Sequence, residues 1–155
     1  MKTLLKKSLL SLTLMAALSM TGCTVTTPSF YVAQGISLDC VPASLAMVIN
    51  NNRYLVGTSK LDASDIKYSM GNYKIMWSVQ DALDTLDHFE LDWRVVADDE
   101  FDGSGQAIVF TRVATGVGHA VYVNNNVVYD PLAITGKLTY PYEVLEIRDE
   151  IIVIN

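Results

Sequence analysis

The distribution of apolar residues divides the chain into a helical part and a strand-rich part. Residues 40–50 are apolar at most positions, as in a buried helix, and the asparagines that close this stretch are expected to end it. Over 77–86 apolar residues recur at helical spacing, with Ser78 as the expected N-cap and Asp81 three residues later. Residues 58–66 carry cap-type side chains and are expected to form a turn or a short helix.

Short apolar runs separated by turn residues follow the helices. The predicted strands are 89–95, 107–110, 119–123, 127–129, 137–140 and 147–154. Residues 124–126 are three asparagines, which tolerate positive φ and therefore predict a hairpin turn between two of these strands. Helices followed by a run of antiparallel strands predict an α+β fold.

The N-terminus has the pattern of a secretion signal. Three lysines within the first seven residues precede an apolar stretch over 8–20, which is too short for a comfortable membrane-spanning helix. The stretch ends in Leu18-Ser-Met-Thr-Gly-Cys23, which resembles a bacterial lipoprotein signal, in which the Cys accepts a lipid and becomes the first residue of the mature chain. An ordinary cleaved signal that leaves Cys23 unmodified is the alternative.

These features predict three regions: a signal peptide over 1–22, the lipidated Cys23 with a short tether over 23–33, and one domain over 34–155. Thr24 stands where an Asp typically marks retention in the inner membrane. We therefore expect a lipid-anchored protein of the cell envelope, at the outer membrane and facing the periplasm, whose membrane contact is the lipid anchor.

Charge and cysteine content narrow the function. The chain has 17 acidic and 11 basic residues, and removal of three lysines with the signal changes the formal charge from −6 to −9. Such an acidic domain is a poor nucleic-acid binder. With Cys23 lipidated, Cys40 has no disulfide partner, and an unpaired thiol in an exported protein indicates a functional role. One thiol and two distant histidines do not resemble a zinc site, so neither a metal nor a cofactor is expected.

Cys40 lies at the start of the first predicted helix, in surroundings that suit a nucleophile. A helix N-terminus presents unpaired N–H groups and a partial positive charge, which stabilise a thiolate. Pro42 fits the first turn because its missing N–H costs little there. Gln34, six residues upstream, is expected to supply a side-chain amide that, with the backbone N–H of Cys40, receives an oxyanion. The alternative for Cys40 alone is an inert buried thiol.

His119 opens a predicted strand directly after a loop that contains glycines, so its imidazole is expected to face a cleft. The hairpin returns the chain so that Asp130 lies near the start of that strand, where it can hydrogen-bond the ring and fix its tautomer. A thiol, an imidazole and a carboxylate in this order indicate a nucleophile, a general base and an orienting partner. Taken singly, His119 is better explained as a structural histidine in the core or at the surface, and Asp130-Pro131 as a turn.

These residues resemble a known family. The pattern Gln34-x5-Cys40, followed by Gly118-His119-Ala-Val-x-Val123 and Asp130-Pro131, is similar to the peptidase domains that remove double-glycine leader peptides in bacteriocin exporters, within the papain-like cysteine peptidase superfamily. The resemblance covers about residues 34–131. It implies a papain-like fold, with an N-terminal helix carrying the Cys and a sheet carrying the His and Asp. It also implies four roles: nucleophile (Cys40), base (His119), orienting carboxylate (Asp130) and oxyanion donor (Gln34).

The sequence therefore predicts a lipid-anchored cysteine peptidase that cleaves a peptide or protein substrate at the cell envelope. One alternative is a papain-like scaffold without catalysis that serves as a binding or assembly module. Val41 supports it, because the family usually has Gly directly after the Cys. A second alternative is an acyltransferase, such as a transglutaminase-like crosslinker, that uses the same three catalytic residues.

Overall fold

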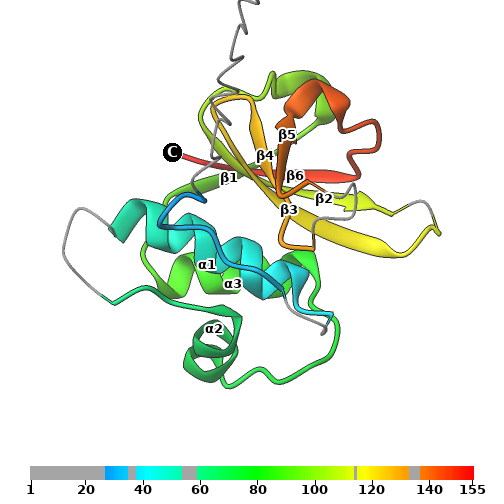
Figure 1. Cartoon of the computed structure of the whole chain (residues 1–155). Helices are drawn as coiled ribbons and strands as arrows, with labels where there is room; N and C mark the ends of the chain where they lie inside the picture. The colour runs from blue at the N-terminus through cyan, green and yellow to red at the C-terminus, as the bar shows by residue number, and fades with distance from the viewer. Residues whose placement is uncertain (1–26, 35–37, 54–58, 114, 133–136) are drawn as a thin grey trace, which may run out of the picture.

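A computed structural model describes residues 27–34, 38–53, 59–113, 115–132 and 137–155, so the predicted signal peptide and Cys23 lie outside the described residues. The helices are α1 (Cys40–Arg53), α2 (Ala63–Met70) and α3 (Val79–His88), with short 3-10 helices η2 (Asp98–Glu100) and η3 (Tyr142–Val144). The strands are β1 (Trp93–Val96), β2 (Gln106–Arg112), β3 (Gly118–Asn124), β4 (Val127–Tyr129), β5 (Thr139–Pro141) and β6 (Glu150–Ile154). The three α-helices lie together below the sheet in the view of Figure 1.

All strand pairs in the sheet are antiparallel, and the strand order is β1-β6-β2-β3-β4-β5. The last strand, β6, therefore inserts between β1 and β2. The hairpin between β3 and β4 forms as predicted, with positive φ at Asn125 and Asn126. The predicted order of helices first and antiparallel strands afterwards is confirmed.

Alternate positions of the central strands serve two cores. On one face the strand residues pack against the helices, with α1 at the centre: Ile108, Phe110, Ala120, Tyr122, Ile152 and Ile154. On the other face a second apolar cluster forms beneath η3: Ala107, Val109, Val121, Val123, Ile151 and Val153. Both faces of the middle strands are thus buried, and α1 is held on a rigid surface. Part of the expected tether joins the first core, since Tyr31 and Val32 are buried there.

Several helix and strand boundaries differ from the predicted ones, and the structure shows a physical reason for two of the differences. α1 continues past Asn50, whose side chain accepts from the N–H of Leu61 and donates to the carbonyl of the same residue, both at 2.8 Å. The strand predicted from residue 89 begins only at Trp93. Phe89 instead caps α3, and Glu90 adopts positive φ in the chain reversal that follows.

One buried hydrogen bond joins the helix that carries the thiol to the strand that carries the imidazole. The Ser44 hydroxyl donates to the backbone carbonyl of Ala120 at 3.1 Å. Ser44 lies one helical turn after Cys40, and Ala120 directly follows His119. Small side chains at Ala43 and Ala46, both fully buried, allow the helix to lie close to its neighbours. No helix in the described part of the chain has the length and apolar content needed to cross a membrane.

We expect Ser44→Ala to lower the free energy of unfolding by about 1–2 kcal/mol, because a buried carbonyl loses a hydrogen-bond donor. Urea denaturation measures this change. Ser69→Ala is a matched control, since the Ser69 hydroxyl bonds only within α2, to the Ile66 carbonyl, and Ser69 is exposed. The control should change stability by less than about 0.5 kcal/mol. Equal effects of the two substitutions on the free energy of unfolding would show that the hydrogen bond from Ser44 to Ala120 does not stabilise the fold.

Candidate active site

Cys40 is the first residue of α1 and has a free, half-buried thiol. The helix begins there because the carbonyl of Asp39 accepts the first intrahelical bond, from the Ala43 N–H at 2.9 Å. The side chain of Asp39 forms an ion pair with Lys67 of α2 at 2.7 Å, and both side chains are largely shielded from solvent. This pair ties α2 to the residue next to the thiol. The ion pair between Asp39 and Lys67 thus restrains the N-terminal end of α1.

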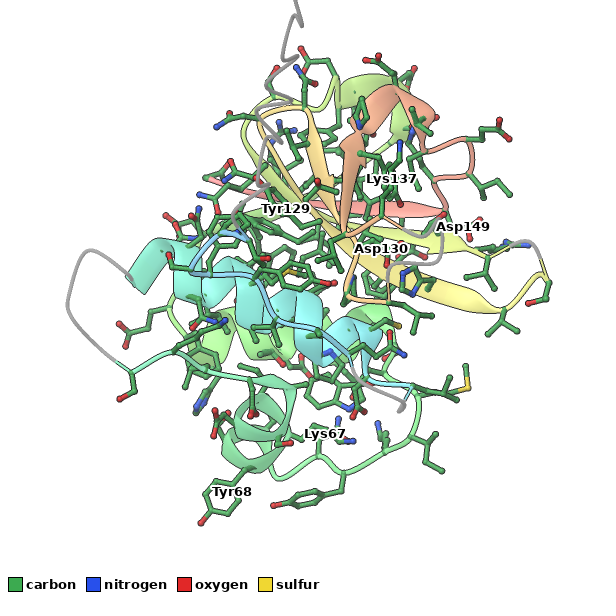
Figure 2. All side chains as sticks on the ribbon, viewed as in Figure 1. Lys67, Tyr68, Tyr129, Asp130, Lys137 and Asp149 are labelled. Atoms are coloured by element: carbon green, nitrogen blue, oxygen red, sulfur yellow. The ribbon has the colours of Figure 1, made fainter. Side chains whose placement is uncertain are left out.

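His119 and Asp130 form a buried pair at one end of the neighbouring strands β3 and β4. His119 is the second residue of β3, and Asp130 follows the last residue of β4. His119 Nε2 lies 2.9 Å from Asp130 Oδ1, with the two side chains 5% and 1% exposed. Asp130 Oδ1 also accepts from the Leu132 N–H at 2.9 Å. Figure 2 shows Asp130 where the end of the sheet meets the helices. The proximity predicted from the hairpin is therefore present.

The imidazole of His119 bridges the carboxylate and the thiol. Burial by itself lowers its pKa, but hydrogen bonds to Asp130 and Cys40, together with their negative charges, outweigh burial and raise the pKa from 6.5 to about 9. Because Nε2 faces Asp130, the other ring nitrogen, Nδ1, is the one left for the sulfur. The imidazolium is thus the favoured form of His119 at neutral pH, and it lies against the group that would become a thiolate.

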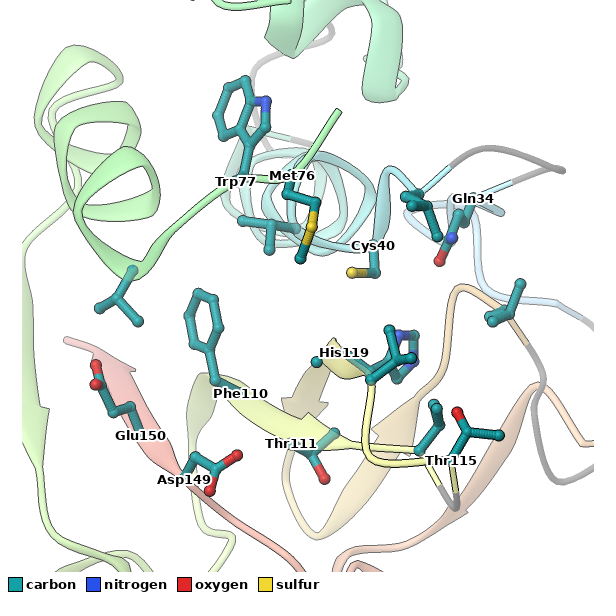
Figure 3. A pocket seen from close by; sticks show the side chains of 17 residues that line it. Gln34, Cys40, Met76, Trp77, Phe110, Thr111, Thr115, His119, Asp149 and Glu150 are labelled. Carbon is teal, nitrogen blue, oxygen red and sulfur yellow. The ribbon is translucent and has the colours of Figure 1, made fainter. Parts of the chain in front are cut away.

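A cleft of about 460 Å³ opens onto the thiol and the imidazole. It lies between the start of α1 and the segment before α3 on one side, and β2, β3 and β6 on the other (Figure 3). Its walls are mainly apolar: Leu38, Val41, Met76, Trp77, Val79 and Phe110. Several of the lining side chains are exposed, among them Leu38 and Met76 at 53% and 65%. A cleft of this size and composition suits a peptide segment.

Gln34 lies beside Cys40 at one end of the cleft (Figure 3). Its side chain is buried, and its backbone N–H donates to the carbonyl of Pro131 at 2.8 Å. That bond attaches the segment before α1 to the chain directly after Asp130. Gln34, Cys40 and His119 therefore border one space, and Asp130 reaches it through the imidazole. The structure brings the four predicted residues together, while their catalytic roles remain predictions.

The structure also shows the positions of His88 and Val41, two residues that the sequence analysis considered. His88 is exposed at the last position of α3, as expected for a solvated helix end. Val41 is buried and forms part of the cleft wall, so its side chain occupies space that a glycine would leave open. Among residues covered by the structure, no three His, Cys, Asp or Glu side chains gather where they could hold a metal ion.

Sequence reasoning missed the residues that shape the cleft beyond the thiol. Trp77 and Phe110 lie in apolar stretches that look like any other core segment. Glu150 opposes Phe110 only because β6 pairs with β2, and the strand order was not predicted. Tyr31 was also missed: its hydroxyl donates to the backbone carbonyl of Asp130 at 2.9 Å, which supports the segment that carries the carboxylate. No pattern in the sequence marks any of these positions.

Comparison with known proteins identifies the fold. No protein-family model matches the chain, and no curated protein matches it. Solved structures do match, among them the crystal structure of the peptidase domain of Streptococcus ComA, a bifunctional ABC transporter involved in a quorum-sensing pathway. The TM-score is 0.59 at 18% sequence identity, and the match covers 79% of this chain and 95% of that domain.

The chain has a peptidase-domain fold. This finding confirms the predicted α+β, papain-like architecture, in which helices precede an antiparallel sheet. At 18% identity the likeness establishes the fold alone. The chemistry of this chain is therefore argued from its own side chains.

The raised pKa of His119 predicts a pH-dependent stability. The folded state holds the proton more tightly than the unfolded state, so this stabilisation is complete below pH 6.5 and is lost as the pH rises through about 9. The free energy of unfolding should fall by up to about 3 kcal/mol over that interval. Urea denaturation of the wild type and of His119→Gln at pH 6 to 10 isolates the effect. The same slope in both proteins would contradict it.

Proposed function

We propose that this protein is a lipid-anchored cysteine peptidase that hydrolyses a peptide or protein substrate at the cell envelope. The observation that carries the proposal is the imidazole of His119, which hydrogen-bonds both Cys40 and Asp130 beside an apolar cleft. The peptidase-domain fold supports the same reaction class.

The proposed reaction begins with attack of the Cys40 thiolate on the carbonyl carbon of the scissile bond. The resulting oxyanion accepts hydrogen bonds from the side-chain amide of Gln34 and from the backbone N–H of Cys40. His119, protonated at the start, gives its proton to the leaving amine as the C–N bond breaks. A thioester to Cys40 remains, and His119 is now neutral.

In the second half, His119 removes a proton from water, and the hydroxyl oxygen attacks the thioester carbonyl. The C–S bond breaks, which releases the carboxylic acid and restores the thiolate and the imidazolium. Asp130 stays ionised throughout and holds the ring in the orientation that both proton transfers require. No metal or cofactor enters this sequence of steps.

Val41 bears on the alternative of a non-catalytic binding module. Its side chain lies in the wall next to the nucleophile, so it limits the size of the acyl group that reaches the sulfur. We infer that Val41 selects a small or extended residue at the cleaved bond.

An acyltransferase would form the same thioester, and analysis of the products with and without an added amine distinguishes it from a hydrolase.

We expect Cys40→Ala to abolish both labelling by iodoacetamide and cleavage of a mixed peptide digest, because the substitution removes the attacking atom. Working in a Cys23→Ser background ensures that labelling reports on one thiol. Mass spectrometry detects labelling and cleavage, and circular dichroism confirms that the variant folds. Cleavage retained by the folded Cys40→Ala protein would refute the peptidase assignment. Labelling without cleavage of any peptide would favour the binding module.

The proposed anchor at Cys23 rests on the sequence, since that residue lies outside the described part of the chain. We expect Cys23→Ser to move the protein from the membrane fraction to the soluble periplasmic fraction, because acyl chains supply the membrane affinity. Fractionation of cells followed by immunoblotting measures the shift. Thr24→Ser is a control that leaves the acceptor cysteine in place. Unchanged membrane association of the Cys23→Ser protein would rule out lipidation there.

A further inference from the structure

Glu150 places a carboxylate at the end of the cleft away from Gln34 (Figure 3). It is the first residue of β6, and it lies opposite Phe110 of β2. It alternates in step with Ile152 and Ile154, whose side chains pack on the helix side of the sheet, so it faces the same side. Within the described residues Glu150 is exposed and has no hydrogen-bond or ion-pair partner. Its charge is therefore available to a ligand.

The adjacent carboxylate is already neutralised. Arg112 donates from Nε to one oxygen of Asp149 at 2.8 Å and from Nη2 to the other at 2.9 Å. This bidentate pair uses both oxygens of Asp149. The backbone N–H of Asp149 donates to the carbonyl of Phe110 at 2.8 Å, which holds the start of β6 against β2. Of the two neighbouring carboxylates, Asp149 is paired with Arg112, whereas Glu150 keeps a negative charge that no described cation neutralises.

Apolar side chains line the approach to Glu150. Val79 and Phe110 belong to the same cleft, and Figure 3 shows Phe110 between Cys40 and Glu150 in that view. An apolar passage that ends in a carboxylate complements lysine or arginine, whose methylene stem packs on the walls while the cation meets the acid. A neutral apolar side chain would partly desolvate Glu150 without a partner, and an acidic one would be repelled.

We infer that the cleft selects a substrate with a lysine or arginine within three residues of the scissile bond, and that Glu150 pairs with that cation. The inference rests on the proposed peptidase function and specifies its substrate class. Overall charge acts in the same direction, because 17 acidic against 11 basic residues attract cationic peptides.

The limit of three residues follows from the register of the sheet. His119 of β3 lies opposite Thr111 of β2, and the neighbouring Phe110 lies opposite Glu150 of β6. The backbone positions of His119 and Glu150 are thus two strand spacings apart, about 10 Å. An extended peptide covers that distance with about three residues.

The test compares two synthetic peptide libraries that are identical except for lysine or norleucine at the variable positions, since norleucine has a similar stem without the charge. We expect the full-length protein to cleave the lysine library about twofold to fivefold faster, with lysine enriched at one position within three residues of the cut. Glu150→Gln should bring the ratio of the two rates close to one. Glu143→Gln removes an equal charge from η3, outside the cleft, and should leave the ratio unchanged.

A wild-type ratio near one, or a ratio that Glu150→Gln does not alter, would overturn the inference while cleavage upholds the peptidase. A second readout separates recognition from chemistry: immobilised Cys40→Ala protein is incubated with both libraries, and the retained peptides are counted by mass spectrometry. Lysine-selective retention that disappears in the Cys40→Ala/Glu150→Gln double variant supports the inference even if the wild type cleaves nothing. Absence of both selective retention and cleavage would overturn the inference and the proposed function together.

Discussion

The contact between the first turn of α1 and the start of β3 is the constraint on which the rest of the site depends. The hydrogen bond from Ser44 to the carbonyl of Ala120 joins a residue one turn after the thiol to the residue directly after the imidazole. Burial of nearly every side chain of α1 between the sheet and the other helices holds this contact in place. Because packed cores resist small displacements, this contact restrains the position of the thiol relative to the imidazole.

The buried charges around His119 are stabilised by one another. An imidazolium removed from water is unfavourable unless opposite charge and hydrogen bonds compensate for lost hydration. Asp130 supplies both, and it is itself restrained by the Leu132 N–H on its side chain and by the Tyr31 hydroxyl on its backbone. The N-terminal arm before α1 thus takes part in the electrostatics of the site. The thiol of Cys40 lies beside the positively charged imidazolium of this pair.

The cleft has a different character at each end, and the two ends come from different parts of the chain. The end near Gln34 is formed by the segment before α1, which is attached to Pro131 after the carboxylate. The far end is formed by β2 and β6, with Phe110 as the wall and Glu150 at the limit. The proposed reaction chemistry and the proposed substrate selection therefore belong to separate structural elements. Glu150 is exposed at the start of β6, so its substitution can alter the proposed selection without disturbing the core that holds α1.

Short-range interactions allowed the sequence alone to predict much of this protein. The capping box of Ser78 and Asp81, the positive φ of Asn125 and Asn126, and the position of Cys40 at a helix start each depend on a few neighbouring residues. Tertiary structure alone decided where α1 ends, that β6 enters the middle of the sheet, and that Glu150 stands opposite Phe110. These features depend on which apolar faces are buried together and on hydrogen bonds between distant segments. Such pairings leave no periodic pattern in a single stretch of sequence, because the free energy that selects them comes from residues far apart along the chain.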